Sequence, residues 1–496
     1  MEALRKVGAG QEWPLFDVAA TRRIEHAALA ATGDHGLMQR AGLATARLAL
    51  ALAPHADTVW IAAGPGNNGG DGLEAAGHLQ AWGKRAVVTW MGTPAAASPD
   101  TAAALQRAQD AGVSFAAEPP AGFDFCIDAL LGIGADRAPE GRMAQWIKHM
   151  HERGAPVLAV DIPTGLNADT GLSSAVCVRA LATLCLLTLK PGLFTGDGRD
   201  ATRQVWLDSL GMDLHGELLA PLSSPTALLQ GAPAPRCLPH ASHKGSFGDV
   251  AIVGGAPGMS GAVLLAGSAA LHCGAGRVYL GLLDPTSMSV DAQQPELMVR
   301  LPDQLNFALL TVVCGCGAGE AVRPLLPRVL STSRSLVLDA DALNSIATDS
   351  QLRAQLRARS ARHPATVVTP HPLEAARLLS ITAREVQRDR LGAAQRLAEE
   401  LQCVVVLKGS GSVIAAPGRA PLINPTGNPR LASAGTGDVL AGAIGAGLAA
   451  GREAVQAASE AVYLHGDCAD RWPVDRALTA SALARSLRAS ATYASA

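Results

Sequence analysis

The sequence predicts an α/β protein made of two doubly wound domains, each with a parallel sheet between layers of helices. Short apolar runs alternate with glycine-containing polar loops and longer segments of helical periodicity, and this pattern occupies both halves of the chain. The length of 496 residues exceeds what one core ordinarily supports. A hydrophobic content of 48% with 17% charged residues is typical of a globular chain.

The composition excludes several classes of partner. A net charge of −2 gives no reason to expect nucleic acid or an anionic membrane surface. The apolar stretches are short and interrupted, so no transmembrane helix is expected, and no signal-peptide pattern occurs at the N-terminus. The nine cysteines form no paired CxxC spacing, which indicates free thiols in a reducing compartment. We therefore expect a cytoplasmic protein.

The first predicted elements are helices within residues 13–55, capped by Asp17, and a buried strand at residues 58–63. The loop after that strand, GPGNNGGDG at residues 64–72, satisfies the GxGxxG pattern of dinucleotide-binding folds. That fingerprint also needs an acid about 20 residues further on, after the next strand. No Asp or Glu occurs between Glu74 and Asp100. The side-chain oxygens of this loop instead suit a monovalent cation or the hydroxyls of a ligand.

Two further strands of the first half end in an acid. The run at 123–128 ends in Asp128, and the run at 156–161 ends in Asp161, shortly before Thr164. Because ligands bind outside the carboxyl ends of parallel strands, we expect these side chains to converge with Asn68. The alternative is that the acids only cap the following helices. Capping explains one such acid well, but it explains less well why acids occur at three strand ends that each lie beside a glycine loop.

Taken together, GPGNNGGDG, IDALLG (a VDALLG-type strand end) and VDIPTGL resemble the motifs of the NAD(P)H-hydrate epimerase domain, over about residues 10–215. The resemblance implies a Rossmann-like domain that interconverts two epimers of hydrated nicotinamide cofactor. It implies a potassium ion on Asn68, Asp128 and Thr164. It implies that the substrate is bound by Asn67, Asn68, Gly69, Gly70, Asp71, Gly132, Ile133, Gly134, Ala135, Asp136, Arg137, Ala138 and Asp161. We expect Asp161 to be the acid/base group, because exchanging a hydroxyl at a ring carbon needs proton delivery and removal.

A domain boundary is predicted where composition changes. Residues 216–235 are rich in Pro, Ala and Ser and lack a strong period, which is typical of a linker. The predicted domains are therefore 1–215 and 236–496.

In the second half, the stretch AGTGDVLAG at residues 434–442 combines glycines, a helix start and the carboxylate of Asp438. The N-terminus of a helix presents free N–H groups and partial positive charge, so it suits a phosphate. An acid in that turn could act as a base, or it could simply cap the helix. The Lys-Gly-Ser-Gly-Ser loop at 408–412 adds a second phosphate-binding candidate, and the spacing of a P-loop is absent.

HKGSFG, VGGAPGMSGA, LDADALN, TPHPLE, LKGSGS and GNPRLASAGTGDVLAG occur in order over about residues 236–490. They resemble the ribokinase-like ADP-dependent NAD(P)H-hydrate dehydratase. The resemblance implies hydrate contacts from Ala262, Gly317, His371 and Asp438, with Asp438 also the base. It implies nucleotide contacts from Lys408, Gly409, Ser410, Gly411, Ser412 and Gly437. ADP would be the co-substrate, with Mg²⁺ accompanying the nucleotide.

The sequence therefore predicts a bifunctional repair enzyme. It would epimerise the R and S forms of hydrated NADH and NADPH, and dehydrate the S form with ADP, giving AMP and phosphate. Two alternatives stay open: a ribokinase-type small-molecule kinase using ATP, and a first half that is a cofactor-binding module recruiting a partner. The Ala- and Gly-rich helices would permit a homo-oligomer.

Overall fold

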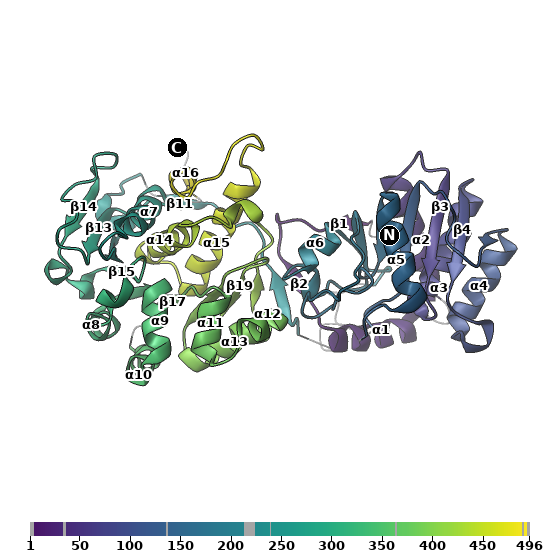
Figure 1. Ribbon diagram of the computed structural model, residues 1–496, viewed down its shortest axis with the longest axis horizontal. Coiled ribbons are helices and arrows are strands. Elements are labelled where there is room, and N and C mark those ends of the chain that lie inside the picture. Colours follow the sequence, from purple (N-terminus) through teal and green to yellow (C-terminus); the bar gives the residue numbers. More distant parts are fainter. Residues whose placement is uncertain are drawn as a thin grey trace. The chain divides into compact units, whose positions relative to one another are not determined.

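The computed structural model describes residues 4–32, 36–134, 137–212, 224–238, 240–362, 365–488 and 491–493. The chain forms two compact units, one of Met1–Gly8 with Trp13–Leu228 and one of Ala9–Glu12 with Leu229–Ala496 (Figure 1). The linker predicted at 216–235 lies partly outside the described residues, and its described part includes the strand β10 (Ala227–Leu229). The predicted boundaries at 215 and 236 stay a prediction.

The first unit contains an eight-stranded sheet in the order β1-β9-β8-β7-β6-β3-β4-β5. Neighbouring strands are parallel except for β1 and β9, which are antiparallel. The strand order reverses at β3, which has β4 on one side and β6 on the other. The strands are β1 (Arg5–Lys6), β3 (Thr58–Ala63), β4 (Arg85–Trp90), β5 (Ser114–Phe115), β6 (Phe125–Ala129), β7 (Val157–Val160), β8 (Ala182–Leu186) and β9 (Gln204–Asp208).

Alternation along β3 sends its side chains to two different cores. Val59 and Ile61 pack with residues of α2, α3 and α4, whereas Trp60 packs with Trp146 of α5 on the other face. The predicted doubly wound arrangement is therefore confirmed in this unit. Its helices are α1 (Val18–Thr32), α2 (Gly36–Leu52), α3 (Asn67–Ala81), α4 (Pro99–Asp110), α5 (Gly141–Arg153) and α6 (Gly198–Thr202), with 3₁₀ turns at Pro94–Ala96 and Pro191–Leu193.

The helical prediction for residues 13–55 is confirmed over α1 and α2 but is wrong at its start. Trp13–Leu15 forms a short strand, β2, whose outer residues are buried and whose central Pro14 is only partly buried. Proline in this position removes a backbone donor, and the alternation of burial suits an extended segment. The helix begins only after Asp17, which caps it by accepting a 2.7 Å hydrogen bond from Ala20 N.

The second unit has a sheet in which β14, β13, β12, β15, β16, β17 and β18 run parallel, followed by antiparallel β19 and β20. Its strand order reverses between β12 and β15. The strands are β12 (Asp249–Gly254), β13 (Arg277–Leu282), β14 (Leu297–Arg300), β15 (Thr311–Cys314), β16 (Ser335–Leu338), β17 (Thr366–Val368), β18 (Val404–Leu407), β19 (Val413–Ala415) and β20 (Leu422–Ile423). A separate pair joins β11 (Arg236–Leu238) to β21 (Ala491–Tyr493).

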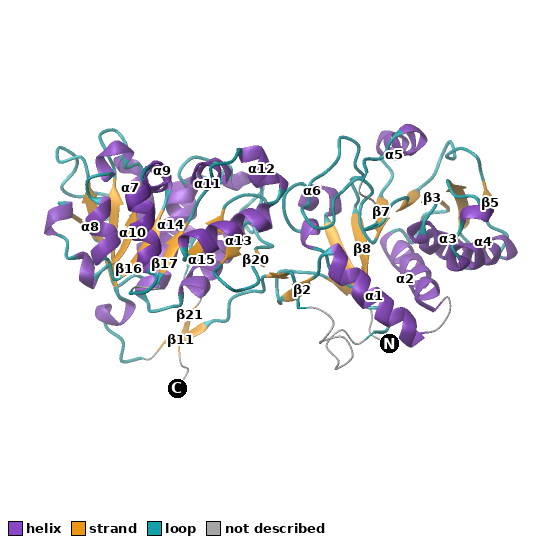
Figure 2. Cartoon of the chain, turned by 90° about the horizontal axis from the view of Figure 1, so that it is seen from below, coloured by secondary structure: helices purple, strands orange, loops and turns teal. Residues whose placement is uncertain are grey.

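Helices cover both faces of this sheet as well (Figure 2). α7 (Ser260–His272), α14 (Thr436–Ala449), α15 (Ala454–Asp470) and α16 (Ala480–Ser486) share one apolar core with the sheet. The other helices are α8 (Leu326–Thr332), α9 (Ala340–Thr348), α10 (Ser350–Arg359), α11 (Pro372–Leu379), α12 (Ala383–Arg388) and α13 (Arg390–Leu401), with 3₁₀ turns at Lys244–Phe247, Pro302–Gln304, Phe307–Leu309, Gly319–Val322 and Pro429–Leu431. Two doubly wound α/β domains are thus confirmed.

Close packing of α14 depends on a glycine. A Cβ at Gly442 would lie 2.0 Å from the carbonyl oxygen of Ala266 in α7, so only glycine lets the two helices approach this closely. The small residues of α14 leave it buried on nearly all sides, which fixes the position of its N-terminus.

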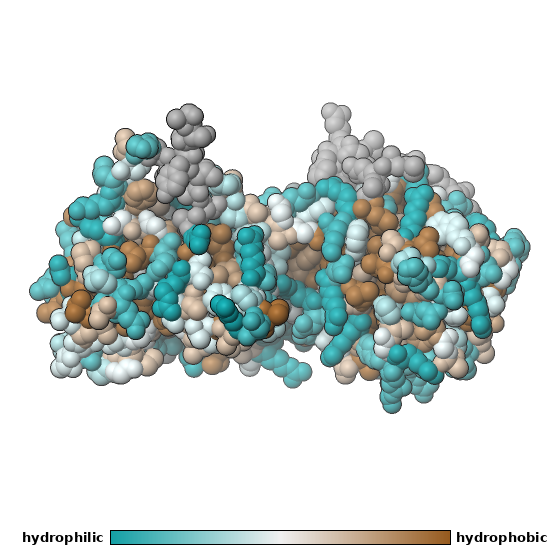
Figure 3. Space-filling model, turned by 90° about the horizontal axis from the view of Figure 1, so that it is seen from above, coloured by the Kyte–Doolittle hydropathy of each residue, from teal (hydrophilic) through white to brown (hydrophobic). Residues whose placement is uncertain are grey.

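Hydrophilic side chains are spread over the face of both units shown in Figure 3. Within the described ranges, no helix is long and apolar enough to cross a membrane.

Candidate active sites

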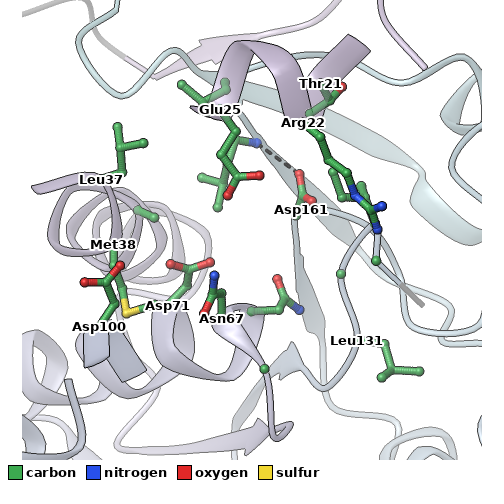
Figure 4. Close-up of a pocket in the computed structure, with 18 of the residues that line it drawn as sticks. Thr21, Arg22, Glu25, Leu37, Met38, Asn67, Asp71, Asp100, Leu131 and Asp161 are labelled. Atoms are coloured by element: carbon green, nitrogen blue, oxygen red, sulfur yellow. Dashed lines mark hydrogen bonds between the residues drawn. The ribbon is translucent and has the colours of Figure 1, made fainter. Parts of the chain in front are cut away.

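A cavity of about 670 Å³ opens at the carboxyl edge of the first sheet, where the strand order reverses (Figure 4). We call it the N-terminal site. Its walls come from α1, α2 and α3 and from the loops that follow β6, β7 and β8. A cavity of this size accommodates a cofactor-sized ligand. It lies where open α/β sheets place their ligands.

Asp128 and Thr164 meet in a buried cluster beside this cavity. The Thr164 hydroxyl donates to Asp128 Oδ1 at 2.7 Å, and the Thr164 backbone N–H donates to Oδ2 at 2.9 Å. Burial raises the pKa of Asp128 to about 6, and the hydrogen bonds from Thr164 oppose this rise. The two strand ends therefore meet, as the sequence predicts.

Asn68, the second residue of α3, adjoins the loop beside this cluster. A Cβ added at Gly132 would lie 3.3 Å from the Cβ of Asn68, and the neighbouring Leu131 N–H donates to the Thr164 hydroxyl at 3.0 Å. One end of the Asn68 amide, Nδ2, is buried and has no hydrogen-bond partner. Among the described residues, no cationic side chain pairs with Asp128, although a buried carboxylate needs a counter-charge. Because no hydrogen bond from the described residues holds Nδ2, half a turn of the Asn68 amide would bring its oxygen to the position that Nδ2 takes. The donor set fits a monovalent cation.

Asp161 forms an ion pair with Lys190, a residue that sequence reasoning missed. The Lys190 side chain is 0% exposed and also donates to Leu186 O at 3.3 Å. Lysines are almost never buried unless paired, so a lysine within the apolar run LCLLTLKPGLF could have drawn attention. Asp161 itself has a φ of +64°, and strained backbone in a non-glycine residue clusters at functional sites.

Two more carboxyl groups face the same cavity. Burial raises the pKa of Glu25 on α1, and the nearby charge of Asp161 raises it further. Burial likewise holds the pKa of Asp71 on α3 well above its usual range, with Asp161 and Glu25 adding to the effect. With Asp100, which also lines the cavity, the carboxyl groups of Glu25, Asp71 and Asp161 thus surround one space (Figure 4). Glu25 was also missed, because a glutamate on a helix looks like an ordinary surface residue.

The remaining substrate-binding candidates take different positions. Gly69 and Gly70 do not line the cavity, because they form the tightly packed first turn of α3. Ala138 is exposed outside it. Ala135 and Asp136 lie outside the described residues. The lining does include Asn67, Asn68, Asp71, Gly132, Ile133, Gly134, Arg137 and Asp161.

In the second unit, the residues after β16 and β18 meet the N-terminus of α14, and we call this the C-terminal site. Lys408 Nζ lies 2.8 Å from Asp339 Oδ1. A Cβ at Gly437 would lie 3.4 Å from the same Nζ, so Gly437 keeps the lysine close to the first turn of α14. The Sγ of Cys316 and carboxylate oxygens of Asp339 and Asp438 lie within 4.8 Å of one another.

Asp438 does not cap α14, because Gly435 takes the N-cap position and no side chain caps the helix there. Burial raises its pKa to about 6, the charge of Asp339 raises it further, and the Cys316 thiol and Lys408 oppose the rise. The Cys316 thiol itself is fully buried, and burial holds its pKa well above the usual range. At neutral pH Asp438 is thus an ionised carboxylate of unusual basicity, placed at the positive end of a helix.

His371 begins α11 and forms a capping box with Glu374. Its Nδ1 accepts hydrogen bonds from Leu373 N at 3.1 Å and Glu374 N at 3.3 Å, and its own backbone N–H donates to Glu374 Oε2. Burial, assisted by Lys408, lowers the pKa of the imidazole, whereas burial raises the pKa of Glu374 to about 7. His371 is therefore a fixed neutral ring at the edge of the site.

The loop at 408–412 is shaped by Arg390, which sequence reasoning missed. Gly409 has a φ of +141°, and a Cβ there would lie 2.8 Å from the guanidinium of Arg390. The fully buried Arg390 donates to Leu407 O and Lys408 O, each at 3.3 Å.

The two residues Ala262 and Gly317, predicted to contact the hydrate, lie next to each other. A Cβ at Gly317 would lie 2.9 Å from the Cβ of Ala262.

Comparison with known proteins bears on both units. A family model described as YjeF-related protein N-terminus matches residues 34–192, and one described as NAD(P)H-hydrate dehydratase matches residues 250–490. The chain is 36% identical over 446 residues to the bifunctional NAD(P)H-hydrate repair enzyme Nnr of Escherichia coli, covering 88% of this chain and 84% of that protein. It is 35% identical to the protein of that name from Coxiella burnetii, covering 92% and 94%. The chain belongs to the family of bifunctional NAD(P)H-hydrate repair enzymes.

Among solved structures, the repair enzyme is similar to an ADP/ATP-dependent NAD(P)H-hydrate dehydratase from Bacillus subtilis. That similarity has 31% identity and a TM-score of 0.41, and covers 50% of this chain and 90% of the other. A ribokinase-like superfamily protein from Enterococcus faecalis shows 26% identity and a TM-score of 0.44, covering 51% and 89%. The family membership confirms the predicted bifunctional repair enzyme, and neither alternative accounts for identity that spans both halves.

Proposed function

We propose that the enzyme interconverts the R and S epimers of hydrated NADH and NADPH at the N-terminal site. The C-terminal site then dehydrates the S epimer with ADP, giving AMP and phosphate. The observation that carries this proposal is the meeting of Asp438, Asp339 and Lys408 at the start of α14, with a separate cavity around Asp161 in the other unit. One chain thus contains two proton-transfer sites of different character.

At the C-terminal site, Asp438 would remove the proton from the hydroxyl of the hydrate as that oxygen attacks the terminal phosphorus of ADP. The backbone N–H groups of residues 435–437, at the start of α14, would stabilise the charge of the transferred phosphoryl group. Lys408, held by Asp339, would add a fixed positive charge. Loss of phosphate from that carbon leaves a C=N⁺ bond, and loss of a proton from the neighbouring ring carbon then restores the dihydropyridine.

The nucleotide would occupy the loop from Lys408 to Ser412 together with Gly437, and Ala262, Gly317 and His371 would contact the hydrate. The proposal includes Mg²⁺ carried by the phosphates of ADP, where it would neutralise negative charge. The carboxylate of Asp339 is an oxygen donor suited to face such an ion.

At the N-terminal site, Asp161 would exchange protons with the hydroxyl that changes faces. Its ion pair with the buried Lys190 supports this role, because the pair fixes the carboxylate at the cavity wall. The lining residues from Asn67 to Asp71 and from Gly132 to Arg137 would bind the hydrate.

Potassium is proposed at Asn68, Asp128 and Thr164, whose oxygens fit such an ion. It would compensate the buried charge of Asp128 and tie together the loops that follow β3, β6 and β7. The proposal further places the enzyme in the cytoplasm as a homo-oligomer, with domains at 1–215 and 236–496. The described cysteines, all free thiols, support a reducing compartment.

Incubating the enzyme with both hydrate epimers, with and without ADP, tests the function directly. We expect full conversion of the mixture to NADH with ADP, and epimer exchange without it. Replacing ADP by ATP measures nucleotide preference. Conversion that consumes the S epimer and leaves the R epimer would contradict the epimerase role. Conversion of the hydrate to NADH without ADP would contradict the dehydratase role.

A further inference from the structure

Glu25 lies on the face of α1 that lines the N-terminal cavity. Thr21, Arg22, Glu25 and Leu29 all contribute to that lining, which matches the spacing of one helical face. A buried hydrogen bond of 2.8 Å between the hydroxyls of Thr21 and Thr188 holds this turn of α1 against the chain segment after β8. In Figure 4 the carboxyl group of Glu25 projects from α1 into the space beside Asp161, which comes from a different wall.

The carboxyl group of Glu25 has no hydrogen bond or ion pair within the described part of the chain, although it is partly buried. Three charged groups act on it: Asp161 from the loop after β7, Lys190 from the segment before Pro191–Leu193, and Arg22 from its own helix. Asp71 on α3 faces the same cavity, and Glu25 in turn raises the pKa of Asp71. Burial and Asp161 favour its neutral form, whereas Lys190 and Arg22 favour the carboxylate. Glu25 is thus free to gain and lose a proton while it faces the cavity.

The chemistry of epimerisation calls for a second group of this kind. Water adds to an enamine at the carbon next to nitrogen, so the hydroxyl of the hydrate sits beside the ring nitrogen. Moving it to the other face requires one group that protonates the departing hydroxyl and another that deprotonates the entering water. A single carboxyl group lies on one side of the ring and cannot serve both faces.

We propose that Glu25 is the second acid/base residue of the epimerase, acting on the face of the ring opposite Asp161. The inference rests on the acid/base role proposed for Asp161. One carboxylic acid protonates the hydroxyl, the C–O bond breaks, and water leaves while the nitrogen lone pair forms a C=N⁺ bond. A water molecule then attacks the other face, forms a new C–O bond, and gives its proton to the second carboxylate. One water leaves and one enters, with no oxidation or reduction.

Asp71 is a weaker candidate for this role. Burial and the surrounding carboxylates hold its pKa well above the usual range, which disfavours the carboxylate form that one step of the cycle needs. It also belongs to α3, next to the residues proposed to bind the hydrate. Glu25 lies on a separate helix and has a longer side chain that reaches into the cavity.

The first test compares Glu25→Gln with wild type in the full-length enzyme. Epimerisation kcat should fall by about 10²-fold or more with little change in KM, because the missing group acts in proton transfer. The pH profile of the variant should lose one of its two limbs, and Glu25→Asp should recover part of the rate. ADP-dependent dehydration of the purified S epimer should be unchanged. The matched control is Glu152→Gln on α5, an exposed glutamate paired only with Lys148, which should leave both activities unchanged.

A second measurement needs no variant. Wild-type epimerisation in H₂¹⁸O should place one solvent oxygen in each epimerised molecule, faster than the uncatalysed exchange. Epimerised product without label overturns the inference. So does Glu25→Gln with wild-type kcat, or with a defect confined to KM. Asp161→Asn, assayed in parallel, separates the two ideas. If Asp161→Asn keeps epimerisation, the role proposed for Asp161 is wrong. If epimerisation is lost in Asp161→Asn but kept in Glu25→Gln, only the role proposed for Glu25 is wrong.

Discussion

Both sites contain a lysine–aspartate ion pair, but the pair includes the proposed acid/base residue in only one of them. Each lies at the carboxyl edge of a parallel sheet and contains a lysine paired with an aspartate. In the N-terminal site, Lys190 binds Asp161, the proposed acid/base residue itself. In the C-terminal site, Lys408 binds Asp339, and the proposed base, Asp438, keeps a pKa raised to about 6.

This difference follows from the chemistry proposed for each site. Phosphoryl transfer creates negative charge on the transferred group, so a lysine and the start of α14 are most useful beside the phosphate. Exchange of a hydroxyl between two faces creates a cationic ring, so several carboxyl groups around one cavity are useful there. The N-terminal site accordingly has the carboxyl groups of Glu25, Asp71, Asp100 and Asp161 in the lining of its cavity. The lysine–aspartate pair is thus a fixed support that either chemistry can use.

The strongest test of this comparison is Asp438→Asn. Dehydration should fall by at least about 10³-fold, since the only proposed base is lost, while epimerisation continues. Recovery of NADH absorbance from the purified S epimer with ADP measures the first activity, and chromatography of the epimers measures the second. Retained dehydration would show that Asp438 is not the base and serves only as a charged residue in the first turn of α14.

Asp161→Asn should give the reverse result. Epimerisation should fall by about 10²-fold or more, and dehydration of the S epimer should persist. The substitution also leaves Lys190 buried without its counter-charge, which costs about 3–5 kcal/mol, so the Tm of the first unit should drop. The double variant Asp161→Asn/Lys190→Met removes both charges and should recover Tm without recovering epimerisation. Recovery of activity would show that the pair is purely structural.

The pH dependence of dehydration sharpens the role of Asp438. The base acts as a carboxylate, the form present above its pKa, so kcat should fall as pH drops through about 6. Cys316→Ala removes a group that lowers this pKa, and it should therefore move the limb to higher pH. Cys314→Ala is the matched control, because Cys314 is equally buried and has no such effect on Asp438. An unmoved limb in Cys316→Ala would place the titrating group elsewhere.

Removing potassium should have the smallest effect and should touch only one site. Exchange of K⁺ for a bulky organic cation should slow epimerisation several-fold, because Asp128 would lose its counter-charge, while dehydration stays constant. Asp128→Asn should abolish the response to K⁺. Equal loss of both activities would contradict a potassium site confined to Asn68, Asp128 and Thr164.

The local pattern of residue types in the sequence was enough to predict the strands, and the loops after them, that carry most of the proposed site residues. The strand at residues 58–63 was predicted with the bounds that β3 has, because a buried apolar run followed by glycines admits few alternatives. The same reasoning predicted that Asp128 and Thr164 would meet, and they share two hydrogen bonds. It works because parallel strands align their carboxyl ends whatever the details of packing.

The partners of the reactive groups could not be predicted in this way. Lys190 lies 29 residues from Asp161, and Lys408 lies 69 residues from Asp339. No local periodicity links such pairs, and a lysine in an apolar run could equally have ended a strand in solvent. Glu25 was harder still, because its role depends on how α1 is held against the segment after β8.

The sequence by itself determined the two α/β domains, the strand-end loops and the family, because each is specified by short patterns of apolar, glycine and acidic residues. Only the tertiary structure decided which carboxyl groups are paired, which are buried and which share a cavity. Those properties set the pKa of Asp438 and place the carboxyl group of Glu25 near Asp161, Lys190 and Arg22 without a hydrogen bond or ion pair from the described residues. They arise from desolvation and from charges brought together by folding, and neither is present in the extended chain.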